Sequence, residues 1–131
     1  MITGLGSRVH LFVRPACRSR FKELFDEILQ CETRDLEFGL SYPILLVSFP
    51  DGSAFSVEFS EEAPAQPQHI DYLHALRGAW IEFRTADVPE VLRRLDDGGI
   101  ASFAHPGSPH RYFTAPGGQV FRILDIDYKG P

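Results

Sequence analysis

The sequence lacks three features, and each absence argues against a class of protein. No apolar run approaches the roughly 18 residues that a membrane-spanning helix requires. Lys and Arg together number 13 against 18 Asp and Glu, and no Lys/Arg-rich run offers a surface for nucleic acid. Only two cysteines are present, too few for a disulfide framework. We therefore expect neither a membrane nor a nucleic acid as a partner.

The two cysteines, Cys17 and Cys31, lie at either end of a helical pattern. At about 1.5 Å rise per residue they would be roughly 20 Å apart, beyond the reach of a disulfide. Residues 1–8 lack the long apolar core of a signal peptide. Reduced thiols without a leader are typical of a cytoplasmic protein, which is the localisation we expect.

The clearest positive feature is an internal repeat. The sequence His-Leu-Phe-Val-Arg-Pro-Ala at 10–16 resembles Trp-Ile-Glu-Phe-Arg-Thr-Ala at 80–86, 70 positions later. Residues 50–57 likewise match residues 116–123, 66 positions later, around a Pro-and-Gly turn in each case. A duplication of this length predicts two halves with the same fold.

Each half predicts one strand, one helix and three further strands. Alternating apolar residues indicate strands, and apolar residues at i, i+3, i+4 and i+7 indicate helices. In the first half we expect a strand at 8–14, a helix at 18–29 with its N-cap near Ser19, and strands at 32–38, 44–49 and 54–60. In the second half we expect a strand at 80–84, a helix between Asp87 and Gly98, and strands at 100–104, 110–114 and 119–126.

These elements predict an α+β fold of two tandem βαβββ modules that form a half-barrel-like, mostly antiparallel sheet. Residues 1–131 form a single domain, with module one at about 8–60, a connector at 61–77 and module two at about 78–127. We expect one or two helical turns at 69–76. Each helix should pack on the sheet of its own module, and the other sheet faces would line a concave surface.

Paired modules of this kind resemble the vicinal oxygen chelate superfamily, which includes glyoxalases, bleomycin-resistance and fosfomycin-resistance proteins and extradiol dioxygenases. The resemblance covers roughly residues 8–127, and the segments that carry it are 10–14, 81–88 and 112–124. It implies the fold. It also implies a site on the concave face, where metal-dependent members place ligands on the first, fourth, fifth and eighth strands. In bleomycin-resistance relatives the site lies between subunits, so the resemblance implies a homodimer.

The residues at those ligand positions predict that no metal is held there. The first strand offers His10, a suitable ligand, but the fifth offers Trp80, which has no lone pair to donate. The eighth offers Arg122, a permanent cation. The fourth strand offers Ser56 by strict pairing of the repeat, or Glu58 two residues later. We therefore expect no cofactor; the alternative is one divalent metal ion with His10 and Glu58 as ligands.

The same face is predicted to bind a small molecule. The candidate ligand-binding residues are His10, Phe12, Glu58, Trp80, Glu82, Arg84 and Arg122. Arg122 should pair with Glu58 or Glu82. One alternative is that Arg122 and its partner form a structural ion pair at the position where metal-dependent members of the superfamily hold the ion. The other is that Arg122 binds an anionic ligand while Trp80 stacks on that ligand.

Three histidines could take part in chemistry. His10 is a candidate general base, or a hydrogen-bonded residue in the wall of the site. His105 and His110 flank a Pro-and-Gly turn and could approach each other across a hairpin. No other catalytic residue is assigned.

The function expected from the sequence is that of a metal-independent small-molecule-binding protein of this superfamily, which could sequester an antibiotic-like ligand. One alternative is a metal-dependent lyase or isomerase of glyoxalase type, or a dioxygenase, with further ligands from His105, His110 or a partner subunit. A second alternative is a structural dimer module without a ligand.

Overall fold

The computed structural model describes residues 1–67 and 78–130. Module one consists of β1 (His10–Val13), a 3-10 turn (Pro15–Cys17), α1 (Arg18–Lys22) continued by wider helical turns (Glu23–Ile28), β2 (Glu32–Leu36), β3 (Ile44–Ser48) and β4 (Ala54–Phe59). Module two consists of β5 (Trp80–Thr85), α2 (Val88–Asp97), β6 (Ser102–Ala104), β7 (Arg111–Thr114) and β8 (Val120–Asp125). The helical turns expected at 69–76 lie outside the described residues.

The eight strands form two four-stranded sheets with the same topology. Their strand orders are β1-β4-β3-β2 and β5-β8-β7-β6. In each sheet the first strand runs parallel to the fourth, and the other neighbours are antiparallel. The α+β fold of two tandem βαβββ modules is therefore confirmed, and the two sheets do not close into a barrel.

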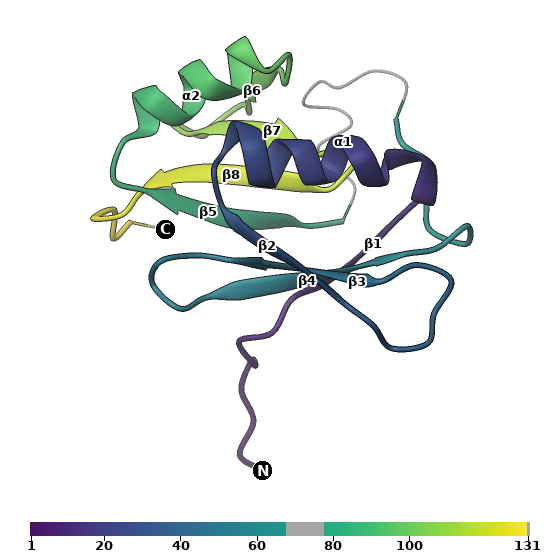
Figure 1. The fold of residues 1–131 in the computed structure, drawn as a ribbon. Coiled ribbons are helices and arrows are strands. Elements are labelled where there is room, and N and C mark those ends of the chain that lie inside the picture. Colours follow the sequence, from purple (N-terminus) through teal and green to yellow (C-terminus); the bar gives the residue numbers. More distant parts are fainter. Residues whose placement is uncertain (68–77, 131) are drawn as a thin grey trace.

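The first helix, α1 together with the wider turns that continue it, packs on both sheets, and not only on that of its own module as expected. The Phe25 ring lies 5.1 Å from Phe55 on β4 and 5.4 Å from Phe121 on β8, measured between ring centroids. Figure 1 shows α1 above the sheet of module one and alongside β8. One apolar core therefore contains residues of both modules. Periodicity identifies the apolar side of a helix, but it does not say what covers that side.

The two helices begin differently. The amide of Glu90 donates to the Asp87 carboxylate (3.1 Å), so Asp87 caps α2 as predicted. The prediction of a cap near Ser19 is wrong, because the chain already turns at Pro15 and α1 begins after Cys17, which makes no side-chain cap hydrogen bond. Proline suits such a first turn because its fixed φ and missing N–H cost nothing there.

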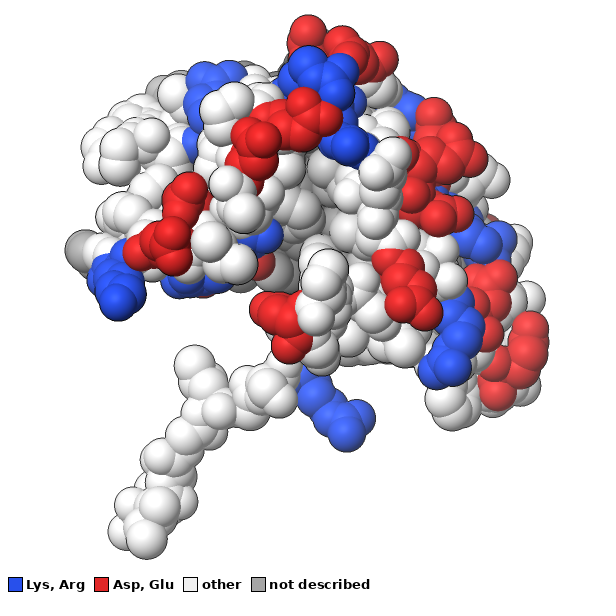
Figure 2. Space-filling view, turned by 60° about the vertical axis from the view of Figure 1, so that its left-hand side comes forward, with Lys and Arg blue, Asp and Glu red and all other residues white. Residues whose placement is uncertain are grey.

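Acidic and basic side chains alternate over the side of the molecule in Figure 2, with no continuous basic area on that side. The same view shows a hollow in the surface near the point where the N-terminal segment leaves the body. No helix within residues 1–67 and 78–130 is long and apolar enough to cross a membrane.

Both cysteines are free thiols in different surroundings. Burial, with a smaller contribution from Asp26, raises the pKa of Cys31 to about 11. The thiolate is the reactive form, so at pH 8 only about one Cys31 side chain in a thousand is ionised. We expect iodoacetamide to label Cys17 and to spare Cys31 in the folded protein.

Peptide mapping by mass spectrometry measures this labelling, with the protein in guanidinium chloride as the control in which both cysteines react. Equal labelling of the two cysteines in the folded protein would contradict the burial of Cys31.

Candidate ligand-binding site

The sheet face of module two carries a cation stacked on an indole ring. Strands β5 and β8 pair in parallel with Glu82 opposite Arg122. The Arg122 guanidinium lies over the Trp80 ring, 3.9 Å from its centroid, and its Nη2 donates to Glu82 Oε1 (3.3 Å). Of the two partners predicted for Arg122, Glu58 and Glu82, the structure selects Glu82. The guanidinium is buried, which strengthens both contacts.

Glu82 lies between two arginines. Arg84 Nε donates to its second carboxylate oxygen (3.0 Å), while Arg84 Nη1 donates to the carbonyls of Ile126 and Tyr128. Burial raises the pKa of Glu82, but the hydrogen bonds and charges of Arg84 and Arg122 outweigh burial and leave this pKa below its usual value. Glu82 is therefore a carboxylate at neutral pH.

The lowered pKa of Glu82 predicts a pH effect on stability. A depressed pKa in the folded state stabilises the protein above the pKa of the unfolded chain, and this contribution is lost as pH falls through the folded-state value. We expect the free energy of unfolding to fall less between pH 5 and pH 3 in Glu82→Gln than in the wild type.

Urea denaturation at several pH values measures the difference between the two proteins. Glu61→Gln, at an exposed position, is the matched control and should follow the wild-type curve. Parallel curves for the wild type and Glu82→Gln would contradict the assigned ion pairs.

His110 and Tyr128 also belong to this cluster, although the sequence did not assign either to it. The His110 ring meets the Tyr128 ring edge-on, with centroids 4.6 Å apart. Burial and the Arg122 cation lower the pKa of His110 against the opposing effect of Glu82. The imidazole is thus neutral at pH 7. Of the two histidines that flank the Pro-and-Gly turn, His105 lies beside Tyr112 (5.6 Å between centroids).

The sheet face of module one centres on His10. Its Nδ1 lies 2.6 Å from the Ser56 hydroxyl, and its Nε2 lies 3.4 Å from Glu58 Oε1. The Phe12 ring contacts His10 edge-on (5.0 Å) and is 57% exposed. Both imidazole nitrogens are therefore engaged by neighbouring side chains.

The turns before β4 and β8 fix how the two modules correspond. The amide of Phe49 donates to the Ser53 carbonyl, and the amide of Ala115 donates to the Gln119 carbonyl in the same way, 66 positions later. This offset confirms the strict pairing of the repeat at its far end.

In the structure, the first strands of the two modules correspond at a different offset from the one that the sequence repeat suggested. Because Ser56 corresponds to Arg122, their strand partners His10 and Glu82 must also correspond, at an offset of 72. The match of His10 to Trp80 at an offset of 70 is therefore wrong by two residues. In an alternating strand a shift of two leaves the same residues on the same face, so the pattern could not reveal the error.

The clusters of the two modules are separate. Among the described residues, no hydrogen bond, ion pair or ring contact joins the pair His10 and Glu58 to Trp80, Arg84 or Arg122. The predicted site residues thus form two groups, one on each sheet.

The residues present do not fit a divalent metal ion of the kind that the fold family implies. Within residues 1–67 and 78–130, no three His, Cys, Asp or Glu side chains lie close enough to share an ion. His10 and Glu58 bond to each other. The corrected correspondence puts Glu82, and not Trp80, at the fifth-strand position, but both of its carboxylate oxygens already accept from arginines. The position of module two that corresponds to Ser56 holds the Arg122 cation. A guanidinium donates hydrogen bonds and cannot ligate a metal.

Comparisons with known proteins identify the fold of this chain. No protein-family model and no curated protein matches the sequence. The structure is similar to TnmS3, an antibiotic binding protein from Streptomyces sp. CB03234 (TM-score 0.64, 15% identity, 95% of this chain and 98% of that chain). The chain has the vicinal oxygen chelate fold.

Two further structures with the vicinal oxygen chelate fold align over nearly the whole chain. One is a glyoxalase family protein from Enterococcus faecalis (TM-score 0.65, 18% identity, 94% of this chain and 98% of that chain). The other is a member of the glyoxalase/bleomycin resistance protein/dioxygenase superfamily from Sphaerobacter thermophilus DSM 20745 (TM-score 0.64, 14% identity, 95% and 99%). At these identities the similarity establishes the fold, and function must be argued from the side chains.

Proposed function

We propose that this chain is a small-molecule-binding protein that needs no metal. Its ligand stacks on the Trp80 ring and accepts hydrogen bonds from Arg122. The observation that carries the proposal is the Arg122 guanidinium over the Trp80 ring. Arg122 occupies the eighth-strand position at which metal-dependent proteins of this fold would place a metal ligand. Among the residues that the structure describes, this cation makes one hydrogen bond, to Glu82, and its Nε has no partner.

The chemistry of this cluster favours a planar ligand with negative charge or hydrogen-bond acceptors. Trp80 is 44% exposed, which leaves indole surface for stacking. Arg122 and Arg84 supply two guanidinium groups, and within residues 1–67 and 78–130 both pair with one carboxylate, Glu82. A second anion at this place would complete the charge balance.

Sequestration of an antibiotic-like compound is the biological role that we propose. A neighbour of the same fold is an antibiotic binding protein, and the side chains around Trp80 offer stacking and charge. Binding alone suffices for sequestration.

We further propose that the binding unit is a homodimer. Phe12 and Trp80 expose large aromatic surfaces on separate sheets, and exposed apolar surface of this kind marks interaction sites. A second copy could bring the His10 face of one chain to the Trp80 face of the other. Light scattering after size-exclusion chromatography tests this, and a monomer at every concentration would contradict it.

The fluorescence of Trp80 tests the binding function. Because Trp80 is the only tryptophan of the chain, its emission reports on this site alone. Anthraquinone-2-sulfonate, a planar aromatic anion, should quench the emission in a saturable way, and bleomycin serves as a cationic comparison. Without saturable binding of either compound, the structural dimer module becomes the better account.

Metal analysis of the purified protein tests the alternative of a glyoxalase-type enzyme. One divalent ion bound per chain, and lost in His10→Ala, would overturn metal independence. We expect less than stoichiometric metal in both proteins.

A further inference from the structure

The sheet face of module one holds a hydroxyl, an imidazole and a carboxylate in a row. Strands β1 and β4 pair in parallel, with His10 opposite Ser56 and Phe12 opposite Glu58. Ser56 and Glu58 are two residues apart on β4, so their side chains leave the same face of the sheet. The His10 Nδ1 lies 2.6 Å from Ser56 Oγ, and its Nε2 lies 3.4 Å from Glu58 Oε1. The imidazole therefore connects the hydroxyl to the carboxylate.

The carboxylate fixes the direction of both hydrogen bonds. A carboxylate only accepts, so a neutral His10 ring carries its proton on Nε2 and donates it to Glu58. Nδ1 then keeps its lone pair and accepts the proton of the Ser56 hydroxyl. A hydroxyl that donates to a base, which is itself oriented by a third group, is the arrangement that activates a nucleophile.

The contact between His10 and Glu58 becomes stronger in such a reaction. At 3.4 Å it lies at the long end of the hydrogen-bond range. When His10 takes the proton of Ser56 the ring becomes a cation, and charge-assisted hydrogen bonds are shorter and stronger than neutral ones. The carboxylate therefore stabilises the protonated ring more than the neutral ring, which lowers the barrier to the reaction.

The row is open to solvent. The side chains of His10 and Glu58 are 37% and 33% exposed, and Ser56 is half-buried. The exposed Phe12 ring, edge-on to His10, offers an apolar surface beside the row. A small ester with an aromatic group can therefore reach the Ser56 hydroxyl.

The row is particular to module one. At the three corresponding positions, module two has Glu82, Arg122 and Leu124. None of these is a hydroxyl or an imidazole, so the repeated fold does not require the row.

We propose that Ser56 is a nucleophile that takes the acyl group from an ester, with His10 as its general base and Glu58 as a positioning residue. Ser56 Oγ attacks the carbonyl carbon of the ester, and its proton passes to His10 Nδ1. The bond from that carbon to the alcohol oxygen breaks, and His10 gives the proton to the departing oxygen. Water then attacks the acyl group on Ser56 in the same way and releases the acid.

The substrate class follows from the exposure of the row. A site open to water stabilises a developing oxyanion only weakly, so the substrates are aryl esters, whose phenolate leaves readily. This activity uses no residue of the Trp80 cluster and does not depend on the binding function proposed there.

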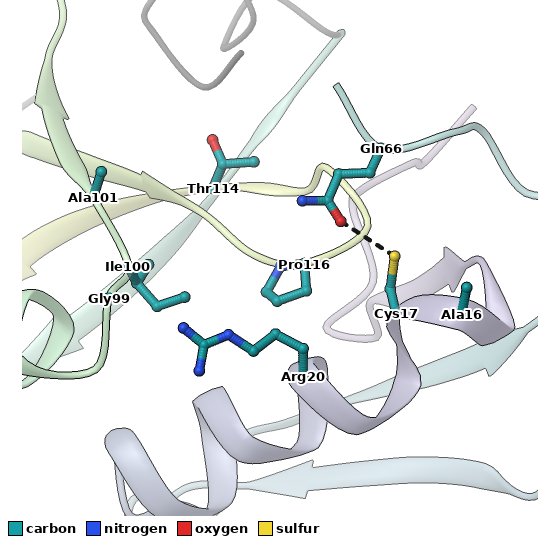
Figure 3. Close-up of a pocket in the computed structure, with 9 residues that line it drawn as sticks. All are labelled: Ala16, Cys17, Arg20, Gln66, Gly99, Ile100, Ala101, Thr114 and Pro116. Carbon is teal, nitrogen blue, oxygen red and sulfur yellow. Dashed lines mark hydrogen bonds between the residues drawn. The ribbon is translucent and has the colours of Figure 1, made fainter. Parts of the chain in front are cut away.

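Cys17 is a competing nucleophile in any test with an aryl ester. It lines a cavity of about 310 Å³ between the two modules, where its thiol donates to Gln66 Oε1 (3.2 Å), as Figure 3 shows. Thiolates also react with aryl esters, so all proteins in the test carry Cys17→Ala. Cys31, with its raised pKa of about 11, contributes little.

Hydrolysis of p-nitrophenyl acetate by these proteins tests the proposal. Ser56→Ala and His10→Gln should each lower the rate by at least about tenfold. Peptide mapping of samples stopped in acid should find the acetyl group on Ser56. Ser48→Ala, which removes a half-buried hydroxyl from β3 on the same sheet face, is the matched control and should keep the rate.

Glu58→Gln should lower the rate and move the pH of half-maximal rate to a lower value, because loss of the negative charge disfavours the protonated imidazole. A merely structural role of Glu58 would lower the rate without moving this profile. Circular dichroism shows that each variant is folded. A rate that survives Ser56→Ala, which is the result expected if the imidazole acts alone, or acetyl groups that map only to other residues would overturn the proposal.

Discussion

Arg122→Leu is expected to weaken the binding of anthraquinone-2-sulfonate by about ten- to a hundredfold, because a hydrogen bond to a charged group contributes about 1.5–3 kcal/mol. Leucine keeps much of the apolar volume beside Trp80 and removes the charge. Glu82 keeps its hydrogen bond from Arg84 (3.0 Å), so no carboxylate is left unpaired. Glu82 is also 38% exposed, so the free energy of unfolding should fall by only about 1 kcal/mol, the net contribution typical of one hydrogen bond.

Quenching of Trp80 fluorescence measures the affinity, and thermal unfolding shows that the variant is folded. Arg93→Leu on α2 is the matched control, since Arg93 pairs with Glu90 and Asp97 on the exposed side of that helix. Affinity that is unchanged in Arg122→Leu, or lowered equally in both variants, would show that Arg122 does not contact the ligand.

Phe121→Ala is expected to lower the free energy of unfolding by about 3–5 kcal/mol, the cost typical of truncating a buried aromatic ring. Phe121 is 1% exposed and contacts three rings: Phe25 on the helix of module one, Phe55 on β4 and Phe113 on β7. Its removal leaves a cavity where the two modules meet. Both modules should therefore be destabilised together, in one unfolding transition.

Urea denaturation followed by circular dichroism measures this loss. Phe38→Ala is the control with the same chemical change at a position that is 69% exposed, and it should alter stability by less than about 0.5 kcal/mol. Two separate transitions in Phe121→Ala, or a loss no larger than that of Phe38→Ala, would contradict a core shared by the modules.

Most of the fold could be predicted from the sequence, because the alternation of apolar residues and the repeat are local signals. The strands at His10–Val13 and Val120–Asp125 fall within the predicted ranges. The correspondence of the first strands could not be predicted, since an alternating pattern is unchanged by a shift of two. Only the hydrogen-bonded ladder distinguishes Glu82 from Trp80 as the counterpart of His10.

The candidate site was predictable where partners lie on neighbouring strands. Arg122 and Glu82 lie on neighbouring strands and on the same sheet face, so they could be predicted as a pair. The same is true of His10 and Glu58 in the other module. The part played by His110 was missed because its neighbour Tyr128 comes from the chain after β8.

The cavity at Cys17 could not be predicted from the sequence. Cys17, Gln66 and Pro116 are far apart along the chain and meet only when the two modules pack together. No local pattern connects residues brought together by packing alone.

The most direct test of the proposed function is the titration of Trp80 fluorescence with anthraquinone-2-sulfonate before and after treatment of the protein with a chelator. The site at Trp80 and Arg122 predicts saturable quenching with the same Kd in both samples, and a Kd at least tenfold weaker in Arg122→Leu. Quenching that disappears on chelation and returns with a divalent ion would contradict a metal-independent site.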